Sequence, residues 1–210
     1  ATLDIKDMFF MVPLDNKDKP QFAFKWDGVQ YTFNQLPQGY KHSSIIAHNA
    51  FAKLLATVKK PPGICIYQYI YDILIGGNDK ECVRETAQTV WQLLTDHDME
   101  VPPSKCQSPA QEVKFLGALW LSGAAAVPDD TLTVIEKGCL PQNKKELQQL
   151  MGTLGHWRKH VPGFSVIARP LYDLLRNKPW DWTPIHAEAI RTLKDELVIN
   201  QRLGPLNPMD

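Results

Sequence analysis

The sequence has 210 residues, enough for one large or two small domains with a buried core. Its 23 basic and 23 acidic residues give a formal charge of zero, so any contact with a polyphosphate must come from a local basic surface. The apolar runs fall well short of the roughly 18 residues that a membrane span needs, and no signal segment opens the chain. We therefore expect an intracellular protein with no membrane partner.

The four cysteines are far apart in the sequence and form neither a C-x-x-C pair nor a zinc-ligand spacing. We expect them to be reduced core residues, and they are Cys65, Cys82, Cys106 and Cys139. The chain opens on an apolar run without an initiator Met. We therefore expect it to be cut from a longer polypeptide.

The N-terminal half predicts strands and helices in the order β, ββ, α, ββ, α, β. Residues 3–14 are apolar and predict a buried strand. Segments 22–26 and 29–33 alternate and are joined by Asp27-Gly28, which favours a tight hairpin. Further along we expect a turn at 36–39, a helix capped by Ser43 or Ser44 and reaching Leu55, a second hairpin within 64–75, a helix over 82–97, and a strand over 113–120 that ends at Ser122-Gly123.

From Pro141 onward the periodicity changes to that of helices only. Three apolar faces are predicted, and the third helix begins with Thr183 as N-cap and Pro184 at its first position. The faces are Leu147, Leu150, Met151, Leu154 and Trp157; then Ile167, Leu171, Leu174 and Leu175; then Ile190, Leu193 and Leu197. Residues 200–210 carry Gly and Pro and predict a linker. The mixed order of strands and helices in the N-terminal half favours an α+β fold with an antiparallel sheet and helices on one face, followed by a helical part.

Two acidic residues interrupt the first apolar segment, Asp4 and Asp7. An unpaired carboxylate in such a segment is costly unless it meets a cation or a metal ion. A structural ion pair and a metal site both satisfy this requirement, and the residues alone leave the two open.

Several separated segments together resemble reverse transcriptases of the gammaretrovirus-like group and related endogenous elements. Leu3-Asp-Ile-Lys-Asp-Met-Phe-Phe10 resembles the first catalytic motif, and Leu36-Pro-Gln-Gly-Tyr-Lys41 resembles the nucleotide-contacting turn. Tyr69-Ile-Tyr-Asp72 resembles the Y-x-D-D catalytic hairpin. Phe115-Leu-Gly117 is similar to the primer grip, and Val161-Pro-Gly-Phe164, Ala168-Arg-Pro-Leu-Tyr172 and Trp180-Asp-Trp182 are similar to thumb segments.

The resemblance implies a reverse-transcriptase palm over residues 1–123, with a residual fingers hairpin at about 12–43. A helical thumb over 124–199 and the start of a connection over 200–210 would follow. The first half of the fingers has no counterpart. The resemblance also implies a pol polyprotein, with a primer–template of RNA and DNA as partner.

The same resemblance implies a magnesium site and a nucleotide site. Asp4, the carbonyl of Ile5 and Asp72 would hold Mg²⁺, where two ions roughly 4 Å apart activate the primer hydroxyl. Phe9 would stack under the incoming sugar, and Gln38 and Lys41 would contact the nucleotide. From the residues alone, a core aromatic and ordinary turn chemistry explain these last three equally well.

One departure from the family falls on the catalytic hairpin, where position 71 is Tyr instead of the first Asp. A neutral phenol is a poor magnesium ligand, because Mg²⁺ prefers carboxylate and phosphate oxygens. Met8 and Ser44 also replace the family's usual Ala and Pro. The sequence therefore predicts impaired catalysis with weakened metal binding.

A stretch from Lys137 to His160 is the densest basic region. It predicts a nucleic-acid-facing surface at Lys144, Lys145, Arg158 and Lys159, and it equally suits a solvated helix face. His156 and His160 have a chelating spacing but no third ligand, so phosphate contact is the better functional reading. Two functions stay open: an impaired polymerase that still binds a primer–template, and a non-enzymatic protein-interaction module derived from an endogenous pol gene.

Overall fold

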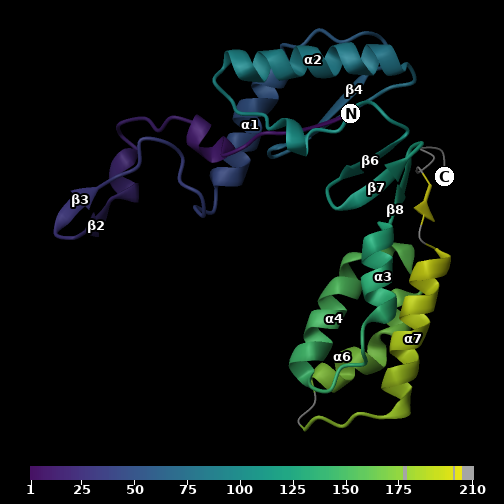
Figure 1. Cartoon of the computed structure of the whole chain (residues 1–210). Coiled ribbons are helices and arrows are strands. Elements are labelled where there is room, and N and C mark those ends of the chain that lie inside the picture. Colours follow the sequence, from purple (N-terminus) through teal and green to yellow (C-terminus); the bar gives the residue numbers. More distant parts are fainter. Residues whose placement is uncertain (177–178, 201, 205–210) are drawn as a thin grey trace. The chain divides into compact units, whose positions relative to one another are not determined.

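The computed structural model describes residues 1–176, 179–200 and 202–204. The chain divides into two compact units, residues 1–116 and 117–210 (Figure 1). The expected palm–thumb boundary near Gly123 stays a prediction.

An antiparallel sheet of three strands forms the centre of the first unit. β5 (Asp72–Gly76) lies in the middle, between β1 (Thr2–Asp4) and β4 (Cys65–Tyr69). The register places Leu3 opposite Ile73 and Asp4 opposite Asp72. Because successive side chains of a strand point to opposite faces, the buried Leu3 and Ile73 share one face, while the two acids lie on the other.

Two helices, α1 (Ser43–Leu55) and α2 (Lys80–Asp96), pack on the apolar face of this sheet. Asp79 caps α2, since its carboxylate accepts a hydrogen bond from the Cys82 backbone N–H at 2.7 Å. The helices and the sheet share one buried cluster, which includes Leu3, Ala47, Phe51, Ile73, Ile75, Val90 and Leu94. The predicted α+β class is therefore confirmed.

The first predicted hairpin is confirmed as β2 (Phe24–Trp26) paired with β3 (Val29–Tyr31). Asp27 and Gly28 have φ of 47° and 76°, the two positive values that such a two-residue turn needs and that Asp-Gly adopts readily. The rings of Phe24 and Tyr31 stack across the strands with centroids 5.6 Å apart.

The predicted strand over 3–14 is wrong beyond Asp4. Asp7 has a left-handed φ of 50°, and a 3-10 helix follows over Met8–Met11. The backbone N–H of Lys6 donates to the carbonyl of Glu100 at 2.9 Å. The apolar residues that suggested a long strand therefore pack as a helical turn.

Two further local predictions need correction. His42 occupies the N-cap of α1, while the buried Ser43 hydroxyl donates to the carbonyl of Pro37 at 2.7 Å, so neither serine caps the helix. The single strand expected over 113–120 is two strands, β6 (Glu112–Phe115) and β7 (Ala118–Leu121). Leu116 and Gly117 separate them, because both have positive φ, 52° and 75°, which a strand cannot accommodate.

A small antiparallel sheet opens the second unit. β7 turns through Ser122-Gly123 into β8 (Ala124–Ala126), and β9 (Arg202–Leu203) pairs with β8. The turn at Ser122-Gly123 is as predicted. The linker expected over 200–210 is wrong at Arg202 and Leu203, which form β9, while residues 201 and 205–210 lie outside the described residues.

Helices make up the rest of the second unit. Five α-helices lie in its described part, instead of the three that were predicted: α3 (Asp129–Lys137), α4 (Lys144–His156), α5 (Phe164–Ile167), α6 (Arg169–Arg176) and α7 (Pro184–Ile199). The sequence predicted no element over α3, and it joined α5 and α6 into one face. Thr183 and Pro184 begin α7 as expected, with the Thr183 and His186 side chains forming a capping box. Among the described residues, no helix is long and apolar enough to cross a membrane.

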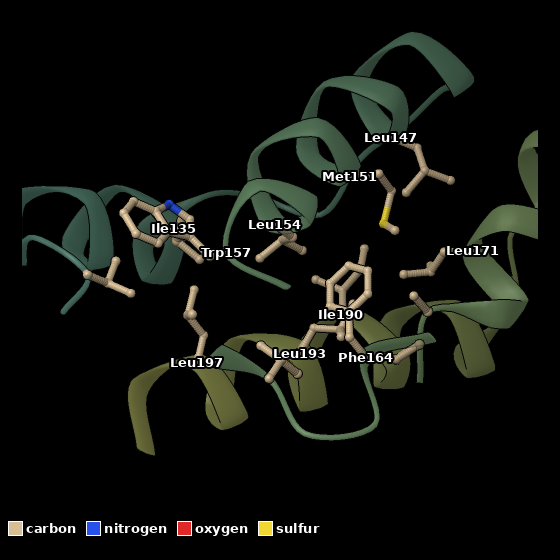
Figure 2. Packing of buried hydrophobic residues seen from close by; sticks show 14 of the residues in the cluster. Ile135, Leu147, Met151, Leu154, Trp157, Phe164, Leu171, Ile190, Leu193 and Leu197 are labelled. Atoms are coloured by element: carbon tan, nitrogen blue, oxygen red, sulfur yellow. The ribbon is translucent and has the colours of Figure 1, made fainter. Parts of the chain in front are cut away.

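One apolar core joins these helices, and Figure 2 shows side chains of α4, α6 and α7 directed toward one another. Leu147, Leu171, Leu193 and Leu197 are completely buried. The three predicted apolar faces therefore meet in one cluster. Burial of this area is the main source of stability for the unit.

The cysteine prediction is correct in part. All four cysteines are free thiols, but none belongs to the fully buried core. Cys65 and Cys139 are exposed, whereas Cys82 and Cys106 are half-buried.

Candidate functional site

Asp4 and Asp72 lie directly opposite each other on the open face of the first sheet. Asp4 ends β1 and Asp72 begins β5, and the two are paired residues of neighbouring strands. The backbone N–H of Ile5 donates to the carbonyl of Tyr71 at 3.1 Å, which extends this pairing by one step. The fold therefore joins two acids that are far apart in the sequence, at the separation expected of paired strands, ~5 Å between Cα atoms.

Lys105 is the third charged residue of the site. It ends a short 3-10 helix, Pro103–Lys105, and its Nζ lies 3.1 Å from Oδ1 of Asp4. The Asp4 side chain is only 19% exposed, so the ammonium neutralises a carboxylate that is largely shielded from water. Sequence reasoning missed Lys105, because no pattern in its Pro-rich loop links it to Asp4.

The charges of the site act on Asp72. Burial raises the pKa of the Asp72 carboxyl, the Asp4 carboxylate raises it further, and the Lys105 ammonium lowers it. Burial therefore has the largest effect on the pKa of Asp72, and the two neighbouring charges act on it in opposite directions.

Replacing Lys105 by Met should raise the pKa of Asp72 further, because the charge that favours its ionised form is removed. Carboxyl ¹³C NMR over a pH titration measures this pKa directly. Lys6→Met is the matched control, since Lys6 pairs with the exposed Glu100 at 2.8 Å. An unchanged or lower pKa of Asp72 in Lys105→Met would contradict this electrostatic account.

Tyr71 lies in the turn between β4 and β5 and is 41% exposed. Tyr69 and Asp72 close this two-residue turn as the last pair of the ladder. The position that the family resemblance assigns to a carboxylate therefore holds a phenol. A phenol is a poor ligand for Mg²⁺, which prefers carboxylate and phosphate oxygens.

The donor set fits one divalent ion better than two. The carboxylates of Asp4 and Asp72 and the carbonyl of Ile5 are the oxygen ligands that Mg²⁺ prefers. A two-ion centre needs a further bridging carboxylate, and no group of three or more His, Cys, Asp or Glu side chains suited to a metal occurs among the described residues. Lys105 also competes with any ion for Asp4. When bound, the ion would supply charge neutralisation for a phosphate.

The predicted nucleotide residues lie on two neighbouring segments. Phe9 is half-buried in the 3-10 helix at Met8–Met11, whereas Gln38 and Lys41 are exposed in the turn before α1. The two segments are joined by the backbone N–H of Leu36, which donates to the carbonyl of Val12 at 2.9 Å. Their contact with a nucleotide stays a prediction.

The four predicted nucleic-acid residues lie at the two ends of α4. Lys144 and Lys145 begin the helix, while Arg158 and Lys159 follow its end in a 3-10 helix. About 20 Å separates the two pairs along the axis, at 1.5 Å per residue. The Nζ of Lys144 also donates to the carbonyl of Leu175 at 3.3 Å. The four residues therefore form two separated basic pairs instead of one compact patch.

Phosphate contact by His160 is contradicted, because this side chain is only 6% exposed. α4 ends at His156, so the two histidines do not share one helix face, and each contacts the Trp157 ring instead. Neither ring nitrogen of His160 has a hydrogen-bond partner with good geometry among the described residues. Burial lowers the pKa of His160, and nearby backbone groups of Ala125 and Trp157 oppose this only in part.

Comparison with known proteins assigns the family. The model of the reverse transcriptase (RNA-dependent DNA polymerase) family matches residues 1–119, more than half of the chain. The chain therefore belongs to the reverse transcriptase family, and the resemblance seen in its motifs is confirmed.

Retroviral polyproteins are among its curated relatives. The Gag-Pol polyprotein of koala retrovirus is 31% identical over 206 residues, covering 94% of this chain and 12% of the polyprotein. The Pol polyprotein of feline endogenous virus ECE1 is 31% identical over 213 residues, covering 97% of this chain and 20% of that protein. The chain thus spans a fifth or less of the length of these two relatives.

Solved structures of foamy viral protease-reverse transcriptase share the fold. The one in complex with an RNA/DNA hybrid has a TM-score of 0.85 and 25% identity, covering 97% of this chain and 28% of that chain. The one in complex with double-stranded DNA has a TM-score of 0.82 and 26% identity, covering 99% of this chain and 43% of that chain.

Proposed function

We propose that the chain is a remnant of an RNA-directed DNA polymerase with an impaired metal centre that retains weak binding of a primer–template. The observation that supports this most is the composition of the site. Asp72 faces Asp4 across paired strands, while the neighbouring residue in the turn is Tyr71. One carboxylate of the expected hairpin pair is absent.

The expected loss of rate follows from this missing ligand. If the bridging carboxylate contributes about 4 kcal/mol to stabilisation of the transition state, its absence lowers the rate roughly a thousandfold. In this proposal the first unit is the palm with its fingers hairpin, and the second unit is the thumb.

Weak binding of nucleic acid is supported by the basic residues at both ends of α4. The foamy viral relatives were solved with an RNA/DNA hybrid and with double-stranded DNA. The chain itself has zero net charge, so only a few cations can replace counterions on the phosphates. Binding should therefore be weak, independent of sequence and lowered by salt with a slope set by those few phosphate contacts.

A salt titration of binding to an RNA–DNA hybrid tests this part of the proposal. Replacing four basic residues by Gln should weaken binding to unrelated sequences alike and flatten the salt slope: Lys144, Lys145, Arg158 and Lys159. A control variant removes the same charge from exposed positions of the first unit: Lys17, Lys53, Lys59 and Lys60. Equal affinity and equal slope for the first variant and the unmodified chain would exclude the second unit as the contact surface.

A protein-interaction module is the second candidate function. It is favoured by the apolar face of the β2–β3 hairpin, where Phe24, Trp26, Val29 and Tyr31 share one face and are all exposed. An exposed apolar patch of this kind often marks an interaction site. Undetectable binding of the hybrid by the unmodified chain at low salt would support this alternative.

A further inference from the structure

The turn that connects β4 to β5 has an unusual backbone. Ile70, its first residue, has a φ of 54°. A β-branched side chain rarely adopts a positive φ, because its Cβ crowds the neighbouring carbonyl. The conformation therefore needs support from the surrounding structure.

Two side chains supply that support from both sides of Ile70. Nδ1 of His48, on α1, accepts a hydrogen bond from the Ile70 backbone N–H at 3.2 Å. Nε2 of Gln68, on β4, donates to the Ile70 carbonyl at 3.0 Å and to the His48 carbonyl at 3.1 Å. Both backbone polar groups of the strained residue are thus held, and the two supporting residues are joined to each other.

The chemistry of these bonds is specific. His48 can accept the Ile70 N–H only as the neutral ring with its proton on Nε2. Gln68 can donate to two carbonyls because its amide nitrogen carries two hydrogens, which a carboxylate in its place would lack. Both side chains also line a pocket of about 390 Å³ between α1 and β4, whose other walls are apolar except for Lys60. No carboxylate lines this pocket, so none competes for the ring or the amide.

We propose that His48 and Gln68 are positioning residues that fix the Tyr69–Asp72 turn and thereby hold Asp72 opposite Asp4. The turn is short, and Tyr69 pairs directly with Asp72. A change in the backbone conformation of Ile70 therefore also changes the position of Asp72, two residues later. The consequence for the metal site rests on the proposed function, whereas the support of the turn does not.

Amide hydrogen exchange at Ile70 tests the support of the turn. In His48→Leu, which removes the acceptor, exchange of this amide should become about tenfold faster, as expected for the loss of one hydrogen bond. His48→Asn should restore most of the protection, because its side-chain oxygen can accept the same N–H. Gln68→Glu should also accelerate exchange of the Ile70 amide, because it removes the donor to the Ile70 carbonyl. It gives a second test of the same turn in case one of the two variants does not fold.

The second readout is Mn²⁺ affinity in a chain that carries Tyr71→Asp. His48→Leu should lower this affinity, and His48→Asn should restore it, whereas a purely structural role would leave it unchanged. His97→Leu is the control, since its ring bonds a carbonyl of α2, Leu93, at 2.8 Å.

The outcomes separate the two proposals. Unchanged exchange at Ile70 in His48→Leu and in Gln68→Glu would overturn the inference, as would unchanged Mn²⁺ affinity despite faster exchange. If exchange becomes faster but the Tyr71→Asp chain binds no Mn²⁺ at all, the proposed function fails, while the support of the turn by His48 and Gln68 stands.

Discussion

Replacing Tyr71 by Asp should tighten Mn²⁺ binding by about tenfold or more, the equivalent of ~1.4 kcal/mol in binding free energy. The new carboxylate adds an oxygen ligand and a negative charge beside Asp72, where the unmodified chain has only a phenol. Titration of the chain with Mn²⁺, followed by electron paramagnetic resonance of the free ion, measures the change.

Tyr31→Asp is the matched control for this experiment. Tyr31 is exposed on β3, which belongs to the two-stranded sheet with β2 and not to the sheet that carries Asp4 and Asp72, so the same charge is added outside the site. If both variants tighten binding equally, a general charge effect explains the result and the assignment of position 71 is wrong.

Leu193→Ala should destabilise the second unit by about 2–5 kcal/mol, because it leaves a cavity in a close-packed core. Leu193 is completely buried in the cluster of Figure 2, between α7 and the helices that face it. Native-state hydrogen exchange of amides in α4 and α7 reports the free energy of opening for this unit.

Ile185→Ala provides the comparison on the same helix. Ile185 is 66% exposed, so its truncation should change the free energy of opening by no more than about 0.5 kcal/mol. Similar effects of the two substitutions would contradict the packing described for α7.

Local patterns predicted much of the fold because the physics behind them is local. Asp27-Gly28 gave the hairpin correctly, since that dipeptide adopts the two positive φ values of the turn. The apolar faces of α4, α6 and α7 followed from residues spaced at three and four. The pairing of Asp4 with Asp72 required the family resemblance, because no local pattern brings two distant strands together.

The remaining features depend on tertiary contacts that a sequence pattern does not encode. Lys105 reaches Asp4 from a loop about a hundred residues away, and His48 reaches Ile70 from a helix. The segment after Asp4 has the composition of a strand, yet the left-handed Asp7 and the bond from Lys6 to Glu100 end it. Burial of His160 likewise results from packing in the second unit, whereas its polar side chain suggested an exposed position.

Primer extension by the unmodified chain tests the central claim most directly. The assay uses a primed RNA template with all four deoxynucleotides and either Mg²⁺ or Mn²⁺. A chain with one carboxylate missing from its catalytic hairpin should give negligible extension, roughly a thousandfold or more below an active relative assayed in parallel. Robust extension by the unmodified chain with either ion would contradict the account of an impaired metal centre.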